Sequence, residues 1–470
     1  MMRLSQAAAA IGARAAGDAV FESVGTDSRL LPRRALFVAL RGENFDGHDF
    51  VGSAANEGAV AAMVDSAWAA NAPACPIPLL VVADTRIALG ALAAHWRSRL
   101  SLPLIGVTGS NGKTTVKEMC ASIMRAQHRV DGVIEDAVLA TSGNFNNEIG
   151  MPLTLLGLKA EHRAAVIEMG MNHPGEIAYL TGLACPTVAV VTNAQRAHLQ
   201  GMGSVAEIAR EKGCIYEGLG ADGVAIINAD DPHADYWRQL NVKRRVITFG
   251  LSAAADVTGE CNFHGPGSRM SVTTPAGNFE LELHVPGEHN ARNALAATAA
   301  CIAAGASSDA VIAGLRGFFG ARGRLQYGPG LNACTLVDDS YNANPDSVRA
   351  AIDVLASTPG RKILVLGDMG EIGRSSAQLH DEIGGYAKSK GVDALFTLGD
   401  MSAVAARNFG DGGHHFRTVD ALLKAVRPQL DENTVVLVKG SRFMRMERVV
   451  TALSAVHNNA PSDTGGSHAS

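Results

Sequence analysis

The ten-residue segment GVTGSNGKTT (106–115) constrains the fold most, because it follows an apolar run (104–108) and opens a helical pattern. A glycine-rich turn between a strand and a helix lets backbone N–H groups converge on phosphate oxygens, where the helix dipole also favours anions. Lys113 would add a positive charge, and the Thr114 hydroxyl would be a ligand for Mg²⁺. The spacing departs from G-x-x-x-x-G-K-[ST], because Val107 stands at the first glycine position. We interpret the segment as a nucleotide phosphate loop.

The order and spacing of the apolar runs divide the 470 residues into three α/β units. Short apolar runs at 35–40, 60–64 and 79–82 precede a helical stretch near 87–100. From 104 to about 318 strands alternate with helices, which favours a mostly parallel sheet with helices on both faces. Segments of period two between about 245 and 285 suggest a small antiparallel excursion. After the turn at 320–324 the α/β alternation starts again.

We therefore expect an α/β fold of three domains. A small N-terminal α/β domain (1–100) would precede a central domain (101–318), whose doubly wound, mostly parallel sheet carries the phosphate loop. A Rossmann-like α/β domain (319–458) would follow, and the polar residues 459–470 would form a disordered tail.

Composition and charge exclude several classes of protein. Lys and Arg number 41 against 46 for Asp and Glu, a formal net charge of −5, so no overall positive field attracts nucleic acid or an anionic membrane. The seven cysteines are scattered without a C-x-x-C pair, which suits reduced thiols in a cytoplasm. No apolar stretch reaches the ~18 residues of a membrane span. We expect a cytoplasmic monomer that binds no nucleic acid and inserts into no membrane.

Polar residues follow two strands of the central unit directly. Glu168 comes after AAVI, and Asn193 comes after TVAVVT. Ligands gather at the carboxyl ends of strands in doubly wound sheets, so Glu168 would be well placed for the metal that a nucleotide brings. The alternative is a solvated carboxylate at a strand end.

One lysine falls on the apolar stripe of an expected helix. Within 204–218 the apolar residues follow helical spacing, and Lys212 lies among them rather than on the polar face. Lys212 would either extend to solvent along the surface or point its amine into an active site. His198, taken alone, would more often be structural than a ligand.

Amide side chains gather in two segments. The run TSGNFNN (141–147) suits turns, and equally suits hydrogen bonding of phosphate, sugar hydroxyl or carboxylate groups. Asn290 and Asn293 open an alanine-rich helix expected at 291–304, where Asn290 would either cap the helix or bind a ligand.

The third unit carries polar residues beyond three of its expected strands, at 338–342, at Asp368 and at 439–442. Three such strand ends imply a second polar cleft. A nucleotide loop in one domain and polar strand ends in another suggest an enzyme that closes on ATP and a carboxylate substrate.

In this order the motifs resemble those of the Mur ligases of peptidoglycan synthesis, over nearly the whole chain. The shared segments are GVTGSNGKTT, TSGNFNN, EMG, the histidine and lysine that follow, HNARNAL and DDSYNANP. The segments DSR (27–29), DGHDF (46–50), GDMGE and VKGSR look specifically like the branch that adds D-Ala-D-Ala. The D-N-P-R motif of the branch that adds the third amino acid is absent from the sequence.

The resemblance implies an ATP-dependent amide ligase that adds D-Ala-D-Ala to UDP-N-acetylmuramoyl-tripeptide through an acyl phosphate. This would be the last cytoplasmic step in making the pentapeptide precursor. It also implies two Mg²⁺ ions, and a carbamate formed by CO₂ on Lys212. The substrates are small molecules, and the N-terminal domain would bind the UDP end of one of them.

Site roles follow from the resemblance residue by residue. The catalytic residues would be Lys113, Glu168, His198 and Lys212, and the metal ligands would be Thr114, Glu168, His198 and carbamylated Lys212. ATP would be bound by Gly109, Ser110, Asn111, Gly112, Lys113, Thr114, Thr115, Asn290, Asn293, Arg324 and Asp339. The other substrate would be bound by Ser28, Arg29, Thr141, Asn144, Asn146 and Asn147.

The same sequence features leave three other functions open. The nearest is a sister ligase with another acceptor, although a folylpolyglutamate-type enzyme would lack the N-terminal UDP-binding domain. Another is a phosphate-loop switch or ATP-binding regulator without ligase chemistry. A nucleic-acid-dependent ATPase is disfavoured by the acidic balance of the chain.

Overall fold

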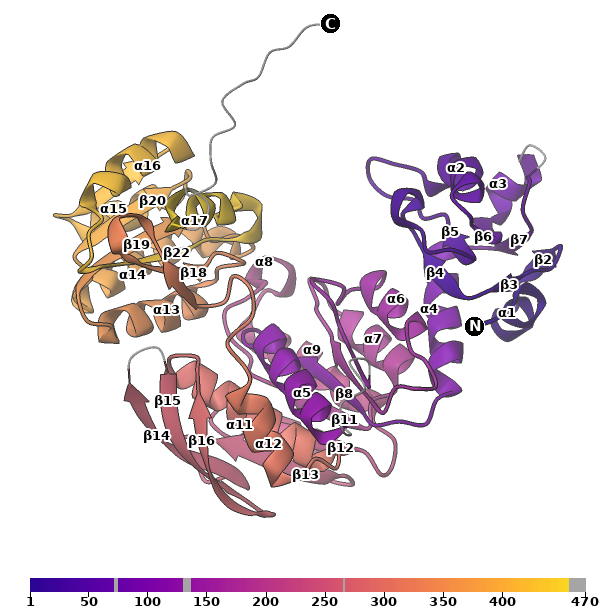
Figure 1. Ribbon diagram of the computed structural model, residues 1–470, viewed down its shortest axis with the longest axis horizontal. Helices are drawn as coiled ribbons and strands as arrows, with labels where there is room; N and C mark the ends of the chain where they lie inside the picture. Colours follow the sequence, from indigo (N-terminus) through magenta and orange to yellow (C-terminus); the bar gives the residue numbers. More distant parts are fainter. Residues whose placement is uncertain (72–74, 130–136, 265–266, 456–470) are drawn as a thin grey trace, which may run out of the picture.

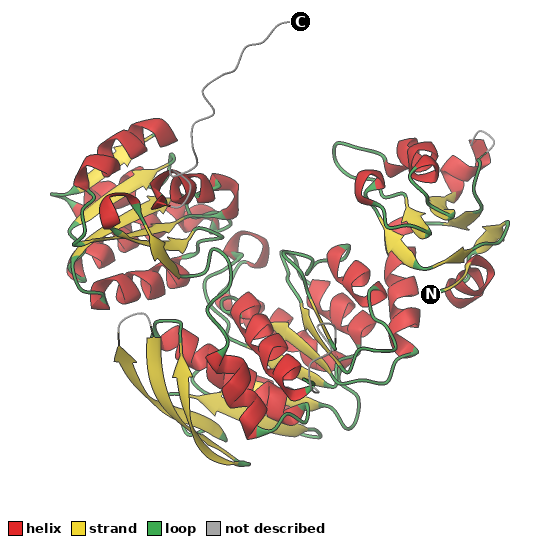
Figure 2. Cartoon of the chain, in the orientation of Figure 1, coloured by secondary structure: helices red, strands yellow, loops and turns green. Residues whose placement is uncertain are grey.

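The computed structural model describes residues 1–71, 75–129, 137–264 and 267–455. The chain forms three lobes, with the central lobe between the other two, and each lobe combines a sheet with helices (Figures 1 and 2). The strands of the three large sheets fall within residues 14–82, 104–283 and 326–439. The expected α/β fold is therefore confirmed. The domain boundaries at 100 and 318 stay predictions, and the expected tail at 459–470 lies outside the described residues.

The N-terminal lobe contains a five-stranded sheet with four parallel strands and one antiparallel edge strand. Its order is β2 (Arg14–Ala16), β7 (Leu79–Val82), β6 (Ala61–Asp65), β5 (Ala35–Val38) and β4 (Ser23–Gly25), with β2 antiparallel to β7. A two-stranded ribbon joins β1 (Met2–Arg3) to β3 (Val20–Phe21). The helices are α1 (Leu4–Ile11), α2 (Val51–Asn56), α3 (Ser66–Asn71) and α4 (Thr85–Ser98).

Helix α4 connects the N-terminal lobe to the central one. It packs against α1 on one side and against α6 (Gly150–Leu156) and α7 (Glu176–Ala184) on the other. Trp96 Nε1 donates to the carbonyl of Leu158 (2.8 Å), and Arg97 Nε donates to the carbonyl of Ala184 (3.1 Å). One apolar core runs across this junction.

The central lobe contains a nine-stranded sheet. Its order is β16 (Gly277–Leu283), β15 (Gly267–Thr274), β14 (Val257–His264), β13 (Arg245–Gly250), β12 (Val224–Asn228), β11 (Val188–Val191), β8 (Leu104–Thr108), β10 (Ala164–Glu168) and β9 (Val138–Ala140). From β9 to β14 neighbouring strands are parallel, whereas β14, β15 and β16 are antiparallel. The expected antiparallel excursion is confirmed.

Alternate residues of this sheet face two separate cores, as a doubly wound sheet requires. One core includes α5 (Lys113–Gln127), α11 (Glu288–Ala303) and α12 (Ser308–Arg316). The other includes α6, α7 and α9 (Val205–Gly213). The shorter helices α8 (Leu199–Met202) and α10 (Ala234–Leu240) complete the lobe.

The C-terminal lobe is built on a six-stranded sheet. Its order is β17 (Gln326–Pro329), β18 (Thr335–Asp339), β22 (Thr434–Lys439), β19 (Arg361–Gly367), β20 (Ala394–Leu398) and β21 (Gly413–Phe416), and only β17 is antiparallel to its neighbour. The helices are α13 (Pro345–Ser357), α14 (Ser376–Ser389), α15 (Ala403–Phe409), α16 (Val419–Val426) and α17 (Glu447–Leu453). Both sheet faces are covered by apolar cores.

Within the described ranges, no helix combines the length and the apolar character that crossing a bilayer requires.

Candidate active site

The phosphate-loop segment is a tight turn from β8 into α5. Gly112 is left-handed (φ 81°), and a Cβ there would lie 2.4 Å from Oδ1 of Asn293, so only glycine fits. The Ser110 N–H donates to the carbonyl of Asn193 (3.0 Å), and the Asn111 N–H donates to Oδ1 of Asn193 (2.9 Å). The loop is thus fixed to the end of β11, the strand beside β8.

Lys113 is the first residue of α5, and its side chain folds back over the loop. Its Nζ donates to the carbonyl of Gly109 (2.7 Å). Burial lowers the pKa of the Lys113 ammonium, the Glu168 carboxylate opposes that shift, and Arg324 adds to it. Lys113 therefore lies between a carboxylate of the central sheet and a cation beside the C-terminal lobe.

Glu168 ends β10 with one carboxylate oxygen that is not satisfied. Its backbone N–H donates to Oγ1 of Thr141 (2.9 Å), and Nδ2 of Asn146 donates to its Oε1 (2.7 Å). The residue is 2% exposed, and no described group hydrogen-bonds its buried Oε2. A buried charged oxygen without a partner costs free energy unless a ligand meets it. This carboxylate fits a hard cation such as Mg²⁺.

Lys212 is buried on α9, and the alternative in which it extends to solvent was wrong. It is 1% exposed, and in the part of the chain that the structure describes no hydrogen bond or ion pair reaches its amine. Burial lowers the pKa of Lys212 well below its ordinary value, and Lys113 lowers it further. A neutral lysine amine is a nucleophile, so the environment fits reaction with CO₂.

His198 contacts the C-terminal lobe through Glu371. Both residues adopt the left-handed region (φ 57° and 60°), which is uncommon for residues other than glycine. Nδ1 of His198 lies 2.7 Å from Oε2 of Glu371, although the approach lacks hydrogen-bond geometry. Contact with His198 lowers the pKa of the Glu371 carboxyl. The Gln200 N–H also donates to the carbonyl of Glu371 (3.0 Å).

A polar cleft beside the loop is shared by the central and C-terminal lobes. Its lining includes Asn111, Gly112, Thr115, His289, Asn290, Asn293, Arg324, Asp339 and Lys439. Nζ of Lys439 donates to Oδ2 of Asp339 (2.6 Å), and both side chains are buried. Burial raises the pKa of Asp339 and lowers the pKa of Lys439. The expected second polar region therefore adjoins the phosphate loop.

Asn290 lies inside α11, so the alternative in which it caps this helix was wrong. The helix begins at Glu288, three residues before the expected start, and Gly287 takes the cap position. Nδ2 of Asn290 donates to the carbonyl of Pro286 (2.8 Å), and its Oδ1 accepts from Nδ2 of Asn293 (3.2 Å).

The other predicted substrate residues separate into two groups. Asn144, Asn146 and Asn147 line a second cleft together with Lys113, Glu168, His198 and Arg324. Thr141 is buried behind Glu168. Ser28 and Arg29 are not brought to this region. They lie in the N-terminal lobe, where Arg29 pairs with Asp27 (2.7 Å).

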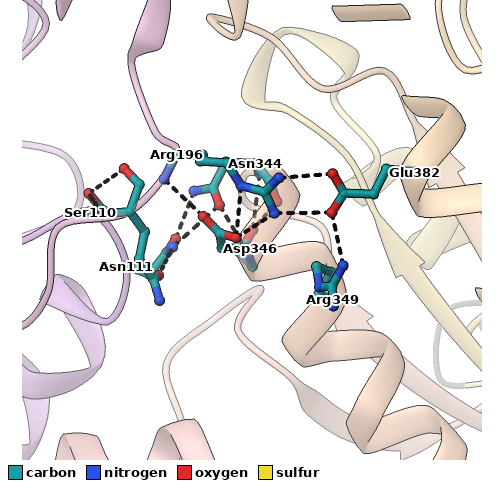
Figure 3. A network of polar contacts seen from close by, with 9 residues as sticks. Ser110, Asn111, Arg196, Asn344, Asp346, Arg349 and Glu382 are labelled. Atoms are coloured by element: carbon teal, nitrogen blue, oxygen red, sulfur yellow. Dashed lines mark hydrogen bonds and ion pairs between the residues drawn. The ribbon is translucent and has the colours of Figure 1, made fainter. Parts of the chain in front are cut away.

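A polar network joins the two lobes beside the loop, and it was not predicted from the sequence (Figure 3). Arg196, after β11, donates to Oδ1 of Asp346 from Nε (3.0 Å) and Nη2 (2.7 Å), and to Glu382 from Nη1 (2.9 Å). Nδ2 of Asn344 donates to Oδ1 of Asn111 (2.7 Å). The pattern N-P at 344–345 signals a helix start, but no local pattern pairs it with residues so far away in the sequence.

Metal ligation would need more than protein carboxylates and imidazoles. Across the described ranges, no three His, Cys, Asp or Glu side chains are grouped so as to hold an ion. An ion at Glu168 would therefore need other ligands, and the candidates are Thr114, His198, a modified Lys212 and nucleotide phosphates.

Three family descriptions match the chain in succession. They are "Mur ligase family, catalytic domain" at 20–97, "Mur ligase middle domain" at 107–301 and "Mur ligase, glutamate ligase domain" at 323–442.

Known proteins are similar to this chain over more than nine tenths of its length. UDP-N-acetylmuramoyl-tripeptide–D-alanyl-D-alanine ligase of Haemophilus influenzae is 43% identical, over 96% of this chain and 99% of that protein. A crystal structure of MurF from Acinetobacter baumannii superposes with a TM-score of 0.87 at 34% identity, covering 96% and 98% of the two chains. MurF of Thermotoga maritima in complex with ADP gives 0.79 at 27% identity, covering 91% and 96%.

Proposed function

The chain belongs to the Mur ligase family, and we propose from that premise that it joins D-alanyl-D-alanine to UDP-N-acetylmuramoyl-tripeptide at the expense of ATP. It is a ligase whose reaction would complete the peptide of the peptidoglycan precursor. The observation that carries this proposal is that Lys113, Glu168, His198 and Arg324 line one cleft, although they come from distant parts of the chain.

The first half of the reaction would activate the tripeptide carboxylate. One of its oxygens attacks the γ-phosphorus of ATP, ADP leaves, and an acyl phosphate forms. Loop N–H groups, Lys113 and Arg324 would bind the phosphates and stabilise the charge on the transferred group. The ADP complex of the Thermotoga maritima relative supports use of this nucleotide.

The second half would form the peptide bond. The dipeptide amine attacks the acyl carbonyl, inorganic phosphate leaves, and the nitrogen loses a proton. The Asn144–Asn147 segment would bind the tripeptide, and Asn146 would orient Glu168 as well. Ser28 and Arg29 would hold the distant uridine end.

Mg²⁺ would be held by Thr114, Glu168, His198 and carbamylated Lys212, and when bound it would neutralise phosphate charge. Oε2 of Glu168, which no described group hydrogen-bonds, supports this set. So does the buried amine of Lys212, which no hydrogen bond or ion pair from a described residue reaches. Addition of CO₂ to the neutral amine releases a proton and turns an uncharged side chain into an anionic one, which suits a metal ligand.

The direct test follows phosphate release and product mass with ATP, Mg²⁺ and UDP-N-acetylmuramoyl-tripeptide, with and without D-Ala-D-Ala. We expect release to require both acceptor and donor, and the UDP product to gain the mass of one dipeptide. Release that ignores the UDP-tripeptide would contradict the proposal. Light scattering after size exclusion tests the expected monomer of 48.9 kDa.

A further inference from the structure

Glu371 belongs to the GDMGE segment after β19, which the neighbouring strand end holds in shape. The Gly370 N–H donates to Oγ of Ser441 (2.6 Å), and the Ser441 N–H donates to the carbonyl of Asp368 (3.0 Å). The same Ser441 hydroxyl donates to the carbonyl of Ala343 (3.0 Å). One serine thus connects the loops after β18, β19 and β22. The position of Glu371 is therefore set by the sheet and not by a free loop.

The backbone of Glu371 is in a conformation that its residue type disfavours. Its φ of 60° persists because the Gln200 N–H binds its carbonyl from the central lobe (3.0 Å) and its neighbour Gly370 is bound to Ser441. Such strain is typical of positions where a side chain must be aimed at a ligand. The side chain remains 57% exposed, so its carboxylate is available to a ligand.

Glu371 places a negative charge in the pocket that would hold the phosphates of ATP. This pocket is lined by residues of the phosphate loop, by Lys113, His198 and Arg324, and by Asn342 and Asn344. Among the described residues that line it, Glu371 alone carries a carboxylate. A carboxylate beside bound phosphates repels them, so its charge there has to be offset by cations. His198 and Lys113 of the same pocket supply part of this offset, because both lower the pKa of the Glu371 carboxyl. Nδ1 of the His198 ring lies 2.7 Å from Oε2 of this carboxylate.

The proposed reaction supplies one organic cation. The acceptor dipeptide carries an α-ammonium group, and its nitrogen must reach the acyl phosphate beside the loop. We propose that Glu371 binds this ammonium group and so places the attacking nitrogen in the cleft. The inference rests on the proposed function and gives the GDMGE segment a role in acceptor recognition. The ammonium loses its proton to solvent before the amine attacks.

The test compares Glu371→Gln with the control Glu432→Gln. Glu432 is an exposed carboxylate that precedes β22, so it lies at the end of this strand opposite to Ser441. Glutamine keeps the size and the polar contacts but removes the charge. We expect the KM for D-Ala-D-Ala to rise about 10-fold or more in Glu371→Gln, since a hydrogen bond to a charged group is lost. The KM values for ATP and UDP-tripeptide should stay near those of the wild type, and Glu432→Gln should behave as wild type.

A nucleophile without a positive charge tests the ammonium contact separately from the formation of the acyl phosphate. Hydroxylamine, which is uncharged at neutral pH, would capture the acyl phosphate as a hydroxamate without needing Glu371. We expect equal hydroxamate formation by Glu371→Gln and the wild type, and a selective defect with the dipeptide. An equal loss with both nucleophiles, or a raised Mg²⁺ requirement, would assign Glu371 to domain contact or metal binding and overturn the inference. An unchanged KM for the dipeptide in Glu371→Gln would also overturn the inference. If the wild type itself fails to ligate the dipeptide, the proposed function fails instead.

Discussion

Arg196 donates three hydrogen bonds to Asp346, from its backbone N–H (2.8 Å), Nε (3.0 Å) and Nη2 (2.7 Å), although 150 positions separate the two residues. The pair joins the segment after β11 to the first turn of α13. That segment also fixes the phosphate loop, because Oγ of Ser110 accepts from the Gln195 N–H (2.9 Å). The orientation of the C-terminal lobe is thus connected directly to the loop that would bind ATP.

Arg196→Ala should loosen this contact. The side chains of Arg196 and Asp346 are 28% and 22% exposed, so the pair is largely shielded from water and its loss should cost about 1–3 kcal/mol. We expect a larger radius of gyration by small-angle X-ray scattering and a several-fold rise in the KM for ATP. Arg238→Ala, which removes a surface pair with Asp235, is the matched control. Unchanged scattering and unchanged KM in Arg196→Ala would contradict the idea that this pair sets the lobe orientation.

Lys113→Ala tests the phosphate loop. Removing a cation that stabilises charge on a transferred phosphoryl group should lower turnover by at least about 100-fold. The fold should persist, because the only hydrogen bonds of this Nζ to described residues are those to loop carbonyls. Phosphate release measures the first effect and far-UV circular dichroism the second. Turnover equal to that of the wild type would remove the loop from the mechanism, and exposed Lys159→Ala serves as the control.

Much of the fold could be predicted from the sequence because the relevant patterns are local. Period-two segments marked the antiparallel strands β15 and β16, and the apolar stripe of 204–218 marked Lys212 as a lysine that is either buried or extended to solvent, of which the structure shows the first. The same stripe overextended the helix. Helix α9 ends at Gly213 and the chain continues as a 3₁₀ turn (Cys214–Gly218). Leu240 and Trp237 lie close to Gly213, and helical spacing in the sequence does not record such a contact.

The candidate site was predicted only where its residues stand in recognisable motifs. Lys113, Glu168 and Asn146 have local signals, namely a glycine-rich turn, a strand end and an asparagine run. Arg196 has none, since its role depends on partners in another lobe. Glu371 ends the GDMGE motif but was not predicted as a site residue, since its contact with His198 also crosses between lobes. Such pairings are set by how the lobes pack, and a single sequence does not encode them as a spacing.

If the carbamate of Lys212 holds the metal, Lys212→Ala should lower the rate of ligation by at least about 100-fold. Burial lowers the pKa of Lys212, so a larger fraction of its amine is neutral near pH 7 and open to CO₂ than for an exposed lysine. Removing CO₂ from the buffer should lower wild-type activity, and bicarbonate should restore it. Lys212→Glu should recover part of the activity through a fixed carboxylate.

A readout that does not depend on turnover is available for the same site. ¹³C-bicarbonate should give a carbamate resonance in the wild type that is absent from Lys212→Ala. Lys388→Ala, which alters a lysine at the surface of α14, should keep that resonance. Full activity in Lys212→Ala would rule out the carbamate.

His289 should make the folded protein sensitive to acid. Burial, aided by the charges of Lys439 and Arg292, lowers its pKa to about 4, whereas an unfolded histidine has a pKa of about 6.5. Above about pH 6.5 both states are neutral and the free energy of unfolding is unaffected. As the pH falls towards 4, the unfolded chain binds a proton that the folded chain does not, so stability decreases by at most about 1.4 kcal/mol per pH unit. Below about pH 4 both states are protonated and the loss levels off, at no more than about 3.4 kcal/mol in total.

His289→Gln should therefore flatten this dependence, because glutamine does not titrate. Urea denaturation of both proteins from pH about 7 down to about 5 would measure the difference in slope. The exposed His173→Gln is the control, and it should leave the wild-type slope intact. Equal slopes for the wild type and His289→Gln would show that this histidine titrates normally in the folded protein.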